Sequence, residues 1–316
     1  MGRAHRSVAR RALTAVRCAC TWFVGAFLGL GAVGAGDVAI VLSQDLAPYR
    51  HAVQGVEEIL GPTAHVFDLA IDPGGDDGVV RRLKSEGPKV VIAIGSRAAH
   101  VVTSRLPGMP TVFCMALGGD VTSLAGPRVT GVSVDVPAER QIATFREVIP
   151  GLSRIAVLYD PSNSGALVER ARAVAAAQGV ELLAEAVVHP EDVPTAFRRA
   201  SRRANGIWLI PDSTVVSRES FEFVLREAAE RRIPLMVFSE PMVRAGALVG
   251  LVPDATEVGR QAAELAVKLR DAPERRVPSI EAPRGLYLAL NLKAAEHLGV
   301  SIPDDVMSRA GSHVYR

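Results

Sequence analysis

Short apolar runs alternate along this chain with longer segments in which apolar residues recur at helical spacing. The runs show little polar alternation, which favours strands covered on both faces, as in a parallel sheet. Strands and helices in alternation predict βαβ units and a doubly wound α/β fold. Strands are expected at residues 38–42, 90–94, 111–115, 155–159, 207–210 and 235–238. Helices are expected at residues 49–60, 78–85, 139–148, 166–178, 194–203, 217–230 and 256–270.

The two halves of the chain repeat one arrangement. In the first half, the run 90–94 is followed by a loop with Ser96 and Arg97, a helix and the run 111–115. In the second half, the run 207–210 is followed by a loop with Asp212, a helix and the run 235–238. Because about 280 residues exceed a comfortable single core, two Rossmann-like lobes are favoured over one large sheet.

Three segments are predicted to carry the chain between the lobes, at Val132–Pro137, Gly250–Asp254 and Ala282–Leu290. Several crossovers form a multi-stranded hinge and not a loose linker. Lobe 1 is then expected at residues 36–133 plus about 255–282, and lobe 2 at residues 134–254 plus about 283–303. Residues 304–316 are expected to form a C-terminal tail.

The first 35 residues have the order of a secretory signal peptide. Residues 1–17 contain five arginines and no acid, and residues 18–35 contain no charge. Small residues at Val33-Gly34-Ala35 suit signal peptidase, so cleavage near Ala35 and a periplasmic location are expected. A retained N-terminal anchor is the alternative, because the uncharged stretch approaches the length of a membrane span.

Composition and charge indicate a globular protein without affinity for nucleic acid. Apolar residues make up 48% of the chain and charged residues 22%, which is a globular composition. The formal net charge is +2, but without the five leader arginines it falls to 31 basic against 34 acidic residues, or −3. A body near −3 gives no electrostatic reason to bind nucleic acid.

The sequence contains no familiar catalytic or metal-binding motif. Cleavage would leave Cys114 as the sole cysteine, a residue expected to be buried, so no internal disulfide is expected. The sequence has no Cys/His pair at the spacing of metal ligands, no P-loop and no G-x-S-x-G elbow. The G-x-G-x-x-G at residues 29–34 lies in the leader, so no nucleotide cofactor is expected. The alternative of an exported α/β hydrolase remains, because Asp212 and Glu240 follow different strands and could form a carboxylate pair for glycoside hydrolysis.

Polar residues that follow the predicted strands are the candidate ligand contacts, because ligands of open α/β sheets bind at the carboxyl ends of strands. They are Asp45, Tyr49, Ser96, Arg97, Cys114, Met115, Asn163, Ser164, Asp212, Thr214, Ser239, Glu240 and Asp254.

The chemistry of this set is that of recognition. Carboxylates at Asp45, Asp212, Glu240 and Asp254 can accept hydrogen bonds from an ammonium group, and Arg97 can hold a carboxylate. Together they would suit a zwitterion such as an amino acid. The alternative for each residue is structural: serine and asparagine cap helices, aspartate stabilises turns, and arginine lies in solvent.

Several stretches of the chain are familiar in combination. They are IAVLYDPSN at 155–163, IPDSTV at 210–215, IPLMVFSE at 233–240, VRAGAL at 243–248, EVGRQAA at 257–263 and LNLKAA at 290–295. Together they resemble the ABC transporter substrate-binding proteins with the type I periplasmic fold and, more narrowly, the group that includes tryptophan/tyrosine-binding proteins. The resemblance runs from about residue 90 to residue 303.

The resemblance implies a monomeric, non-enzymatic protein that closes on a small molecule and delivers it to an ABC permease in the inner membrane. Related domains also act as extracytoplasmic sensors coupled to a signalling receptor, so that alternative stays open. The loops Ser96–Ala99 and 117–120 depart from the family pattern where the side chain of the ligand would lie. The identity of the solute therefore stays open.

Overall fold

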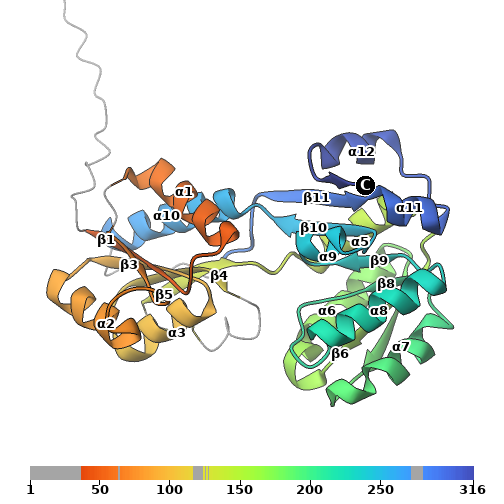
Figure 1. Ribbon diagram of the computed structural model, residues 1–316, viewed down its shortest axis with the longest axis horizontal. Coiled ribbons are helices and arrows are strands. Elements are labelled where there is room, and N and C mark those ends of the chain that lie inside the picture. The colour runs from red at the N-terminus through yellow and green to blue at the C-terminus, as the bar shows by residue number, and fades with distance from the viewer. Residues whose placement is uncertain (1–36, 63–64, 117–123, 125, 127, 272–279) are drawn as a thin grey trace, which may run out of the picture. The chain divides into compact units, whose positions relative to one another are not determined.

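The computed structural model describes residues 37–62, 65–116, 124, 126, 128–271 and 280–316 (Figure 1). The predicted signal peptide at residues 1–35 and the loop at residues 117–120 lie outside these residues. Among the residues that the structure describes, no helix has both the length and the apolar character needed to cross a bilayer.

The first sheet has five parallel strands in the order β2-β1-β3-β4-β5. The central strand β3 is paired with β1 from Val38↔Val90 to Leu42↔Ile94. All residues of β1 and β3 are buried, as expected of apolar runs with helices on both faces. The strands are β1 (Val38–Leu42), β2 (His65–Asp68), β3 (Val90–Ile94), β4 (Thr111–Ala116) and β5 (Val129–Ser133).

Among the described residues, four helices cover this sheet. Helices α1 (Ala47–Leu60) and α10 (Ala255–Asp271) pack on one face, where Val56 and Leu265 join the core around Ile92. Helices α2 (Gly75–Glu86) and α3 (Ser96–Arg105) pack on the other face, around Phe113. The chain therefore returns to the first sheet to contribute α10 after it has built most of the second (Figure 1).

Helices α1 and α10 approach so closely that glycine is required on both. A Cβ atom at Gly55 would lie 1.9 Å from the carbonyl oxygen of Thr256, and one at Gly259 would lie 2.0 Å from that of Ala52. Real side-chain atoms cannot come this close to a backbone oxygen, so the two glycines set the distance between the helices.

The second sheet has seven strands in the order β12-β11-β10-β9-β8-β6-β7. Strands β6 to β10 are parallel, β11 is antiparallel to β10, and β12 is parallel to β11. The strands are β6 (Arg154–Tyr159), β7 (Glu181–Ala186), β8 (Gly206–Trp208), β9 (Leu235–Val237), β10 (Val249–Pro253), β11 (Leu286–Asn291) and β12 (Val314–Tyr315).

Helices again cover both faces of the sheet. One core gathers α5 (Ala138–Val148), α6 (Pro161–Ala177) and α12 (Asp304–Ala310) around Trp208. The opposite core gathers α7 (Val193–Ser201), α8 (Arg218–Glu230) and α9 (Glu240–Arg244) around Phe197. A short 3-10 turn at Pro190–Asp192 precedes α7, and α11 spans Leu292–Leu298. The predicted α/β class with two sheets is therefore confirmed.

The expected C-terminal tail is wrong. Residues 304–316 form α12 and β12, and β12 extends the second sheet through the pairs Leu290↔Val314 and Asn291↔Tyr315. Burial explains the difference, because Val306 and Ala310 fill one core of this sheet. Their spacing of four residues places both side chains on one face of a helix.

Candidate functional site

The carboxyl end of the first sheet is organised around Ser43 and Gly95. The Ser43 hydroxyl donates to the Ile94 carbonyl at 3.1 Å and accepts from the Ala98 N–H at 2.9 Å, so it links the end of β3 to the start of α3. Gly95 has a φ of +94°, and a Cβ atom there would lie 2.5 Å from Ser43 Oγ and 2.7 Å from the Tyr49 hydroxyl. The predicted ligand residue Tyr49 thus lies directly against the backbone at this strand end.

Cys114 and Met115 differ in their surroundings although they are adjacent. Cys114 is fully buried, and burial raises the pKa of its thiol to about 12, so it is a core residue without nucleophilic character. Met115 is half-buried and has a left-handed φ of +56°, where the pairing of β4 with β5 shifts between Cys114 and Ala116. Such a backbone conformation is uncommon for a residue with a side chain and often occurs beside binding sites.

The charged candidates of the first lobe are paired within the chain. The Asp45 carboxylate lies 2.6 Å from the Arg50 guanidinium, and Arg97 donates to Asp76 of α2 at 2.7 Å. All four side chains are partly or largely exposed, so both pairs are surface ion pairs. Ser96 begins α3 and is half-buried. Arg97 is therefore directed toward α2, and a ligand carboxylate would have to compete with Asp76.

Two aspartates join the strand-end loops of the second lobe. Asp212 Oδ2 accepts from the Asp160 N–H at 2.8 Å, and its Oδ1 accepts from the N–H groups of Thr214 and Val215 at 3.0 and 3.2 Å. Asp160 in turn accepts from the Thr214 hydroxyl at 2.7 Å and from the Ser162 N–H at 2.8 Å. These two donors hold the pKa of Asp160 below its usual range. Asp212 is thus occupied by backbone donors.

Asn163 completes this second-lobe cluster. Its side-chain amide donates to the hydroxyls of Ser213 and Thr214 at 3.2 and 3.0 Å. Asn163 and Ser213 are exposed, whereas Ser164 is buried in α6. Asn163, Thr214 and Ser213 therefore form the accessible polar part of this cluster, and Ser164 lies behind them.

The predicted pair Ser239 and Glu240 has a different environment. Glu240 accepts from the Tyr287 hydroxyl at 2.7 Å, from the Tyr315 hydroxyl and from the Arg244 guanidinium at 2.9 Å. Although partial burial acts to raise the pKa of Glu240, these donors hold it below its usual range. Tyr315 belongs to β12, so Glu240 anchors the last strand. Ser239 precedes α9, and its side chain makes no capping hydrogen bond within the described chain.

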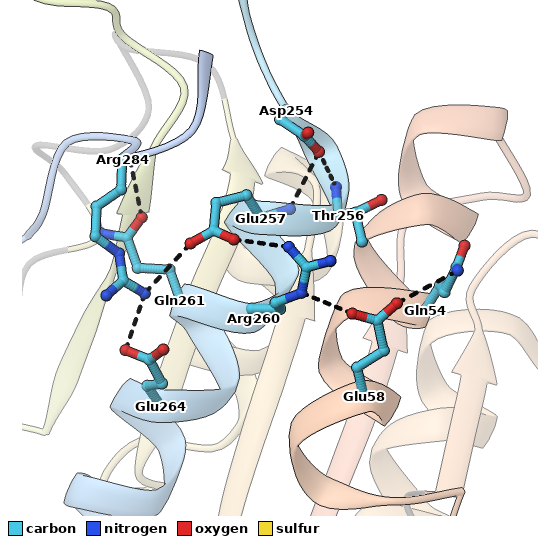
Figure 2. A network of polar contacts seen from close by, with 9 residues as sticks. All are labelled: Gln54, Glu58, Asp254, Thr256, Glu257, Arg260, Gln261, Glu264 and Arg284. Atoms are coloured by element: carbon cyan, nitrogen blue, oxygen red, sulfur yellow. Dashed lines mark hydrogen bonds and ion pairs between the residues drawn. The ribbon is translucent and has the colours of Figure 1, made fainter. Parts of the chain in front are cut away.

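Asp254 lies where the chain leaves β10 for α10, and it caps that helix. Its Oδ1 accepts from the N–H groups of Thr256 and Glu257 at 2.9 and 3.1 Å, and its own N–H donates to the Gly285 carbonyl at 3.0 Å. The capping contacts are visible at the top of Figure 2. Asp254 therefore ties two crossover segments together, and all three of its contacts are internal.

A wider polar network surrounds this crossover (Figure 2). Arg284, from the segment before β11, donates to Glu264 at 2.9 Å, and its backbone N–H donates to the Gln261 side chain at 3.2 Å. Arg260 bridges Glu257 of its own helix and Glu58 of α1, at 2.7 and 2.6 Å. The helix α10 thus holds both α1 and the crossover at residues 281–285.

A separate cavity of about 480 Å³ lies in the second lobe, between α8, α11 and the last residues of the chain. None of the predicted ligand residues lines it. Within the described residues, no cluster of three or more His, Cys, Asp or Glu side chains has the geometry to hold a metal ion. The arrangements at both strand-end edges are hydrogen-bonding surfaces made of hydroxyl, amide and carboxylate groups.

Ser43 and Asp160 organise the two strand-end edges, although neither is among the residues predicted from the sequence. The signal for Asp160 was present in the Asp-Pro pair that begins α6, since aspartate at the N-cap and proline at the first helical position are typical of a helix start. The role of Ser43 has no local signal, because its partners Ile94 and Ala98 lie more than fifty residues away in sequence.

The family model of the ABC transporter substrate binding proteins matches residues 75–314, which include parts of both sheets. The chain belongs to this family. Among curated proteins, an uncharacterized protein of Rickettsia prowazekii is 24% identical over 266 residues, which cover 81% of this chain and 83% of that protein. The tyrosine-binding protein of Clostridioides difficile is 23% identical over 199 residues, 60% of this chain and 57% of its own length.

Solved structures share the fold of this family member. The ABC domain from Streptococcus pneumoniae in complex with L-Trp has a TM-score of 0.64 and 20% identity, and covers 88% of this chain and 99% of its own. The ligand-free, open structure of CD0873, a substrate-binding protein with adhesive properties from Clostridium difficile, has a TM-score of 0.69 and 16% identity, and covers 88% and 97%. These similarities confirm the type I periplasmic fold.

Membership of the family establishes the general role. Proteins of this family bind a solute outside the cytoplasm and serve a membrane permease, and they are generally not enzymes. The hydroxyl and amide groups at the strand ends have the chemistry that solute recognition requires.

Proposed function

We propose that this chain is the exported solute-binding component of an ABC importer and that it binds an amino acid or a similar small polar molecule between its lobes. The match of the family model to residues 75–314 carries the proposal. Two similar proteins bind aromatic amino acids, as their names state: the tyrosine-binding protein of C. difficile and the S. pneumoniae domain in complex with L-Trp. Together they support a ligand of amino-acid size.

The strand-end clusters supply the contacts that such a ligand needs. Tyr49 and Met115 of the first lobe offer an aromatic ring and an apolar side chain, and Asn163 and Thr214 of the second offer amide and hydroxyl groups. Binding first to one lobe and closure of the other about the hinge would remove the ligand from water. The paired residues Asp45, Asp212, Glu240 and Asp254 take a structural role in this proposal.

The leader and the charge of the body complete the proposal. Five arginines before an uncharged stretch support export and cleavage near Ala35, with a periplasmic mature protein. The partner is a permease of the inner membrane, the protein acts as a monomer, and no nucleic acid, cofactor or catalysis is involved.

Calorimetry and thermal unfolding of residues 36–316 test this proposal. The twenty L-amino acids and a set of small metabolites are screened at saturating concentration, and a ligand at 100 times its Kd stabilises the folded protein by about 2.7 kcal/mol. Asn163→Ala is expected to weaken binding, because it removes the amide that faces Ser213 and Thr214. A folded protein that responds to no compound contradicts the proposal.

Asn205→Ala is the matched control. Asn205 lies at the amino end of the strands, where it accepts from the Arg154 N–H at 2.8 Å and donates to the Gly151 carbonyl at 2.9 Å. This substitution is expected to lower stability and leave the Kd unchanged. A sensor would bind the same ligand, so reconstitution with an ABC permease in vesicles separates the two roles: an importer requires the protein for ligand uptake.

A further inference from the structure

The first crossover between the lobes contains a carboxylate, Asp135, that differs from the acids considered so far. Asp135 is half-buried, and within the described residues its carboxylate has no ion pair. A hydrogen bond with the Ser133 side chain acts to lower the pKa of this carboxyl group, and the nearby positive charge of Arg170 also acts to lower it. Burial nevertheless outweighs both and raises the pKa of Asp135 above its ordinary value. Among the described residues, the contacts of this carboxylate therefore do not fully compensate its loss of water.

The backbone on both sides of Asp135 is anchored. The N–H of Ser133 donates to the Glu281 carbonyl at 2.9 Å, and that of Asp135 donates to Ser133 Oγ at 2.8 Å. On the other side, Val136 is buried and its carbonyl accepts from the Gln141 amide at 2.7 Å. The backbone that carries the carboxylate is consequently held in place.

Asp135 also lies close to the candidate ligand residues of the first lobe. Ser133 is paired with Ala116 at the end of β4, immediately beyond the left-handed Met115. Asp135 follows two residues later, past the carboxyl end of β5, which is the edge where ligands of such sheets bind. The position thus fits a ligand contact.

The four acids expected from the sequence to bind an ammonium group already have partners within the chain. Asp45 is paired with Arg50, and Asp212 accepts three backbone N–H groups. Glu240 is held by two tyrosines and Arg244, and Asp254 caps α10. Asp135, by contrast, has no ion pair among the described residues, so its carboxylate can still accept from a charged donor.

We infer that Asp135 accepts the protonated amine of the bound solute, so the solute is a primary amine of the amino-acid type. This inference rests on the proposed function and specifies the chemistry of its site. An ammonium group supplies the positive charge and the N–H donors that the half-buried carboxylate lacks. Arg97, which remains paired with Asp76, is not required to recognise the solute.

The test compares amines with their deaminated analogues by calorimetry on residues 36–316. Any L-amino acid that binds is paired with its deaminated acid, for example L-tyrosine with 3-(4-hydroxyphenyl)propanoate and L-tryptophan with indole-3-propanoate. Asp135→Asn is expected to weaken binding of the amine by about 10- to 100-fold, the range for loss of a charged hydrogen bond. Binding of the deaminated acid should change by less than about threefold, well below that range.

Two control variants separate this role from others. Asp45→Asn removes an exposed acid and should leave the affinity for the amine unchanged. Arg170→Gln tests whether Asp135 serves instead as an internal partner of Arg170. The inference would be overturned if Asp135→Asn weakened binding of the amine and of the deaminated acid equally, and if Arg170→Gln had the same effect.

The stability of the ligand-free protein provides a second measurement. Because the carboxylate is half-buried without an ion pair, Asp135→Asn should leave the melting temperature unchanged or raise it. A marked fall identifies a structural role and contradicts the inference. If wild-type protein binds solutes without an amine, the inference fails and the proposed function stands. If no solute binds, both fail.

Discussion

The Asp212 carboxylate accepts a hydrogen bond from the backbone N–H of Asp160 at 2.8 Å, across fifty-two residues of sequence. This contact joins the loop after β8 to the loop after β6. Both residues are buried, and each also accepts a bond from the loop that begins at Ser213: Asp212 from the Thr214 N–H, and Asp160 from the Thr214 hydroxyl. The edge of the second sheet is therefore ordered before any ligand arrives, which lowers the entropic cost of binding.

Replacing Asp212 with alanine should lower the free energy of unfolding by about 2–4 kcal/mol, because backbone donors of Asp160, Thr214 and Val215 lose a charged acceptor. Urea denaturation measures this change. Thr214→Val is the milder comparison, since it removes one hydroxyl and leaves the Asp212 contacts intact. A loss below that of Thr214→Val would show that Asp212 does not organise the loops.

Gly259→Ala should destabilise the first lobe by about 2–4 kcal/mol, since α1 and α10 must separate to admit the new methyl group. Gly151→Ala is the control, because a Cβ atom at this exposed turn meets nothing within 4 Å. Thermal unfolding of the two variants provides the comparison. Equal melting temperatures would contradict the close approach of the helices.

The Cys114 thiol should resist alkylation in the folded protein. Burial raises its pKa to about 12, so the reactive thiolate is scarce at pH 8 and the sulfur is inaccessible. Iodoacetamide labelling followed by mass spectrometry is expected to modify Cys114 in urea and not in native buffer. Rapid labelling of the native protein would place the thiol at the surface.

Glu240→Gln should lower the melting temperature at pH 7. The difference in melting temperature between the variant and the wild-type protein should narrow as the pH falls. The pKa of Glu240 is lowered in the folded state by Tyr315, Tyr287 and Arg244, so its contribution is present above the unfolded pKa of about 4.3. That contribution is lost as the pH falls through the folded value. Melting curves between pH 3 and 7 measure the convergence.

Glu191→Gln serves as the control for the same experiment. Glu191 is exposed, and within the described residues its side chain makes no hydrogen bond or ion pair that a glutamine would break. The melting temperature of Glu191→Gln should equal that of the wild-type protein between pH 3 and 7. If Glu240→Gln behaves in the same way, the carboxylate does not hold β12 by its charge.

The sequence alone determined the α/β class and most of the helices and strands. Runs such as Val38–Leu42 and Val90–Ile94 are strands with the predicted bounds, because residues buried on both faces of a sheet must be apolar without alternation. Helix α5 was predicted within one residue, since its apolar residues keep helical spacing. The family resemblance, expected from about residue 90 to residue 303, was likewise confirmed.

Only the tertiary structure decided which polar residues are available to a ligand. Asp212 and Glu240 both follow strands, but their partners Asp160 and Tyr287 lie about fifty residues away in sequence, so chain order does not reveal them. No local sequence pattern marks Asp135, and its half-burial without an ion pair among the described residues is a feature of the tertiary structure. The same reason explains β12: two residues carry too little periodicity to predict a strand, and it forms because β11 offers an unpaired edge.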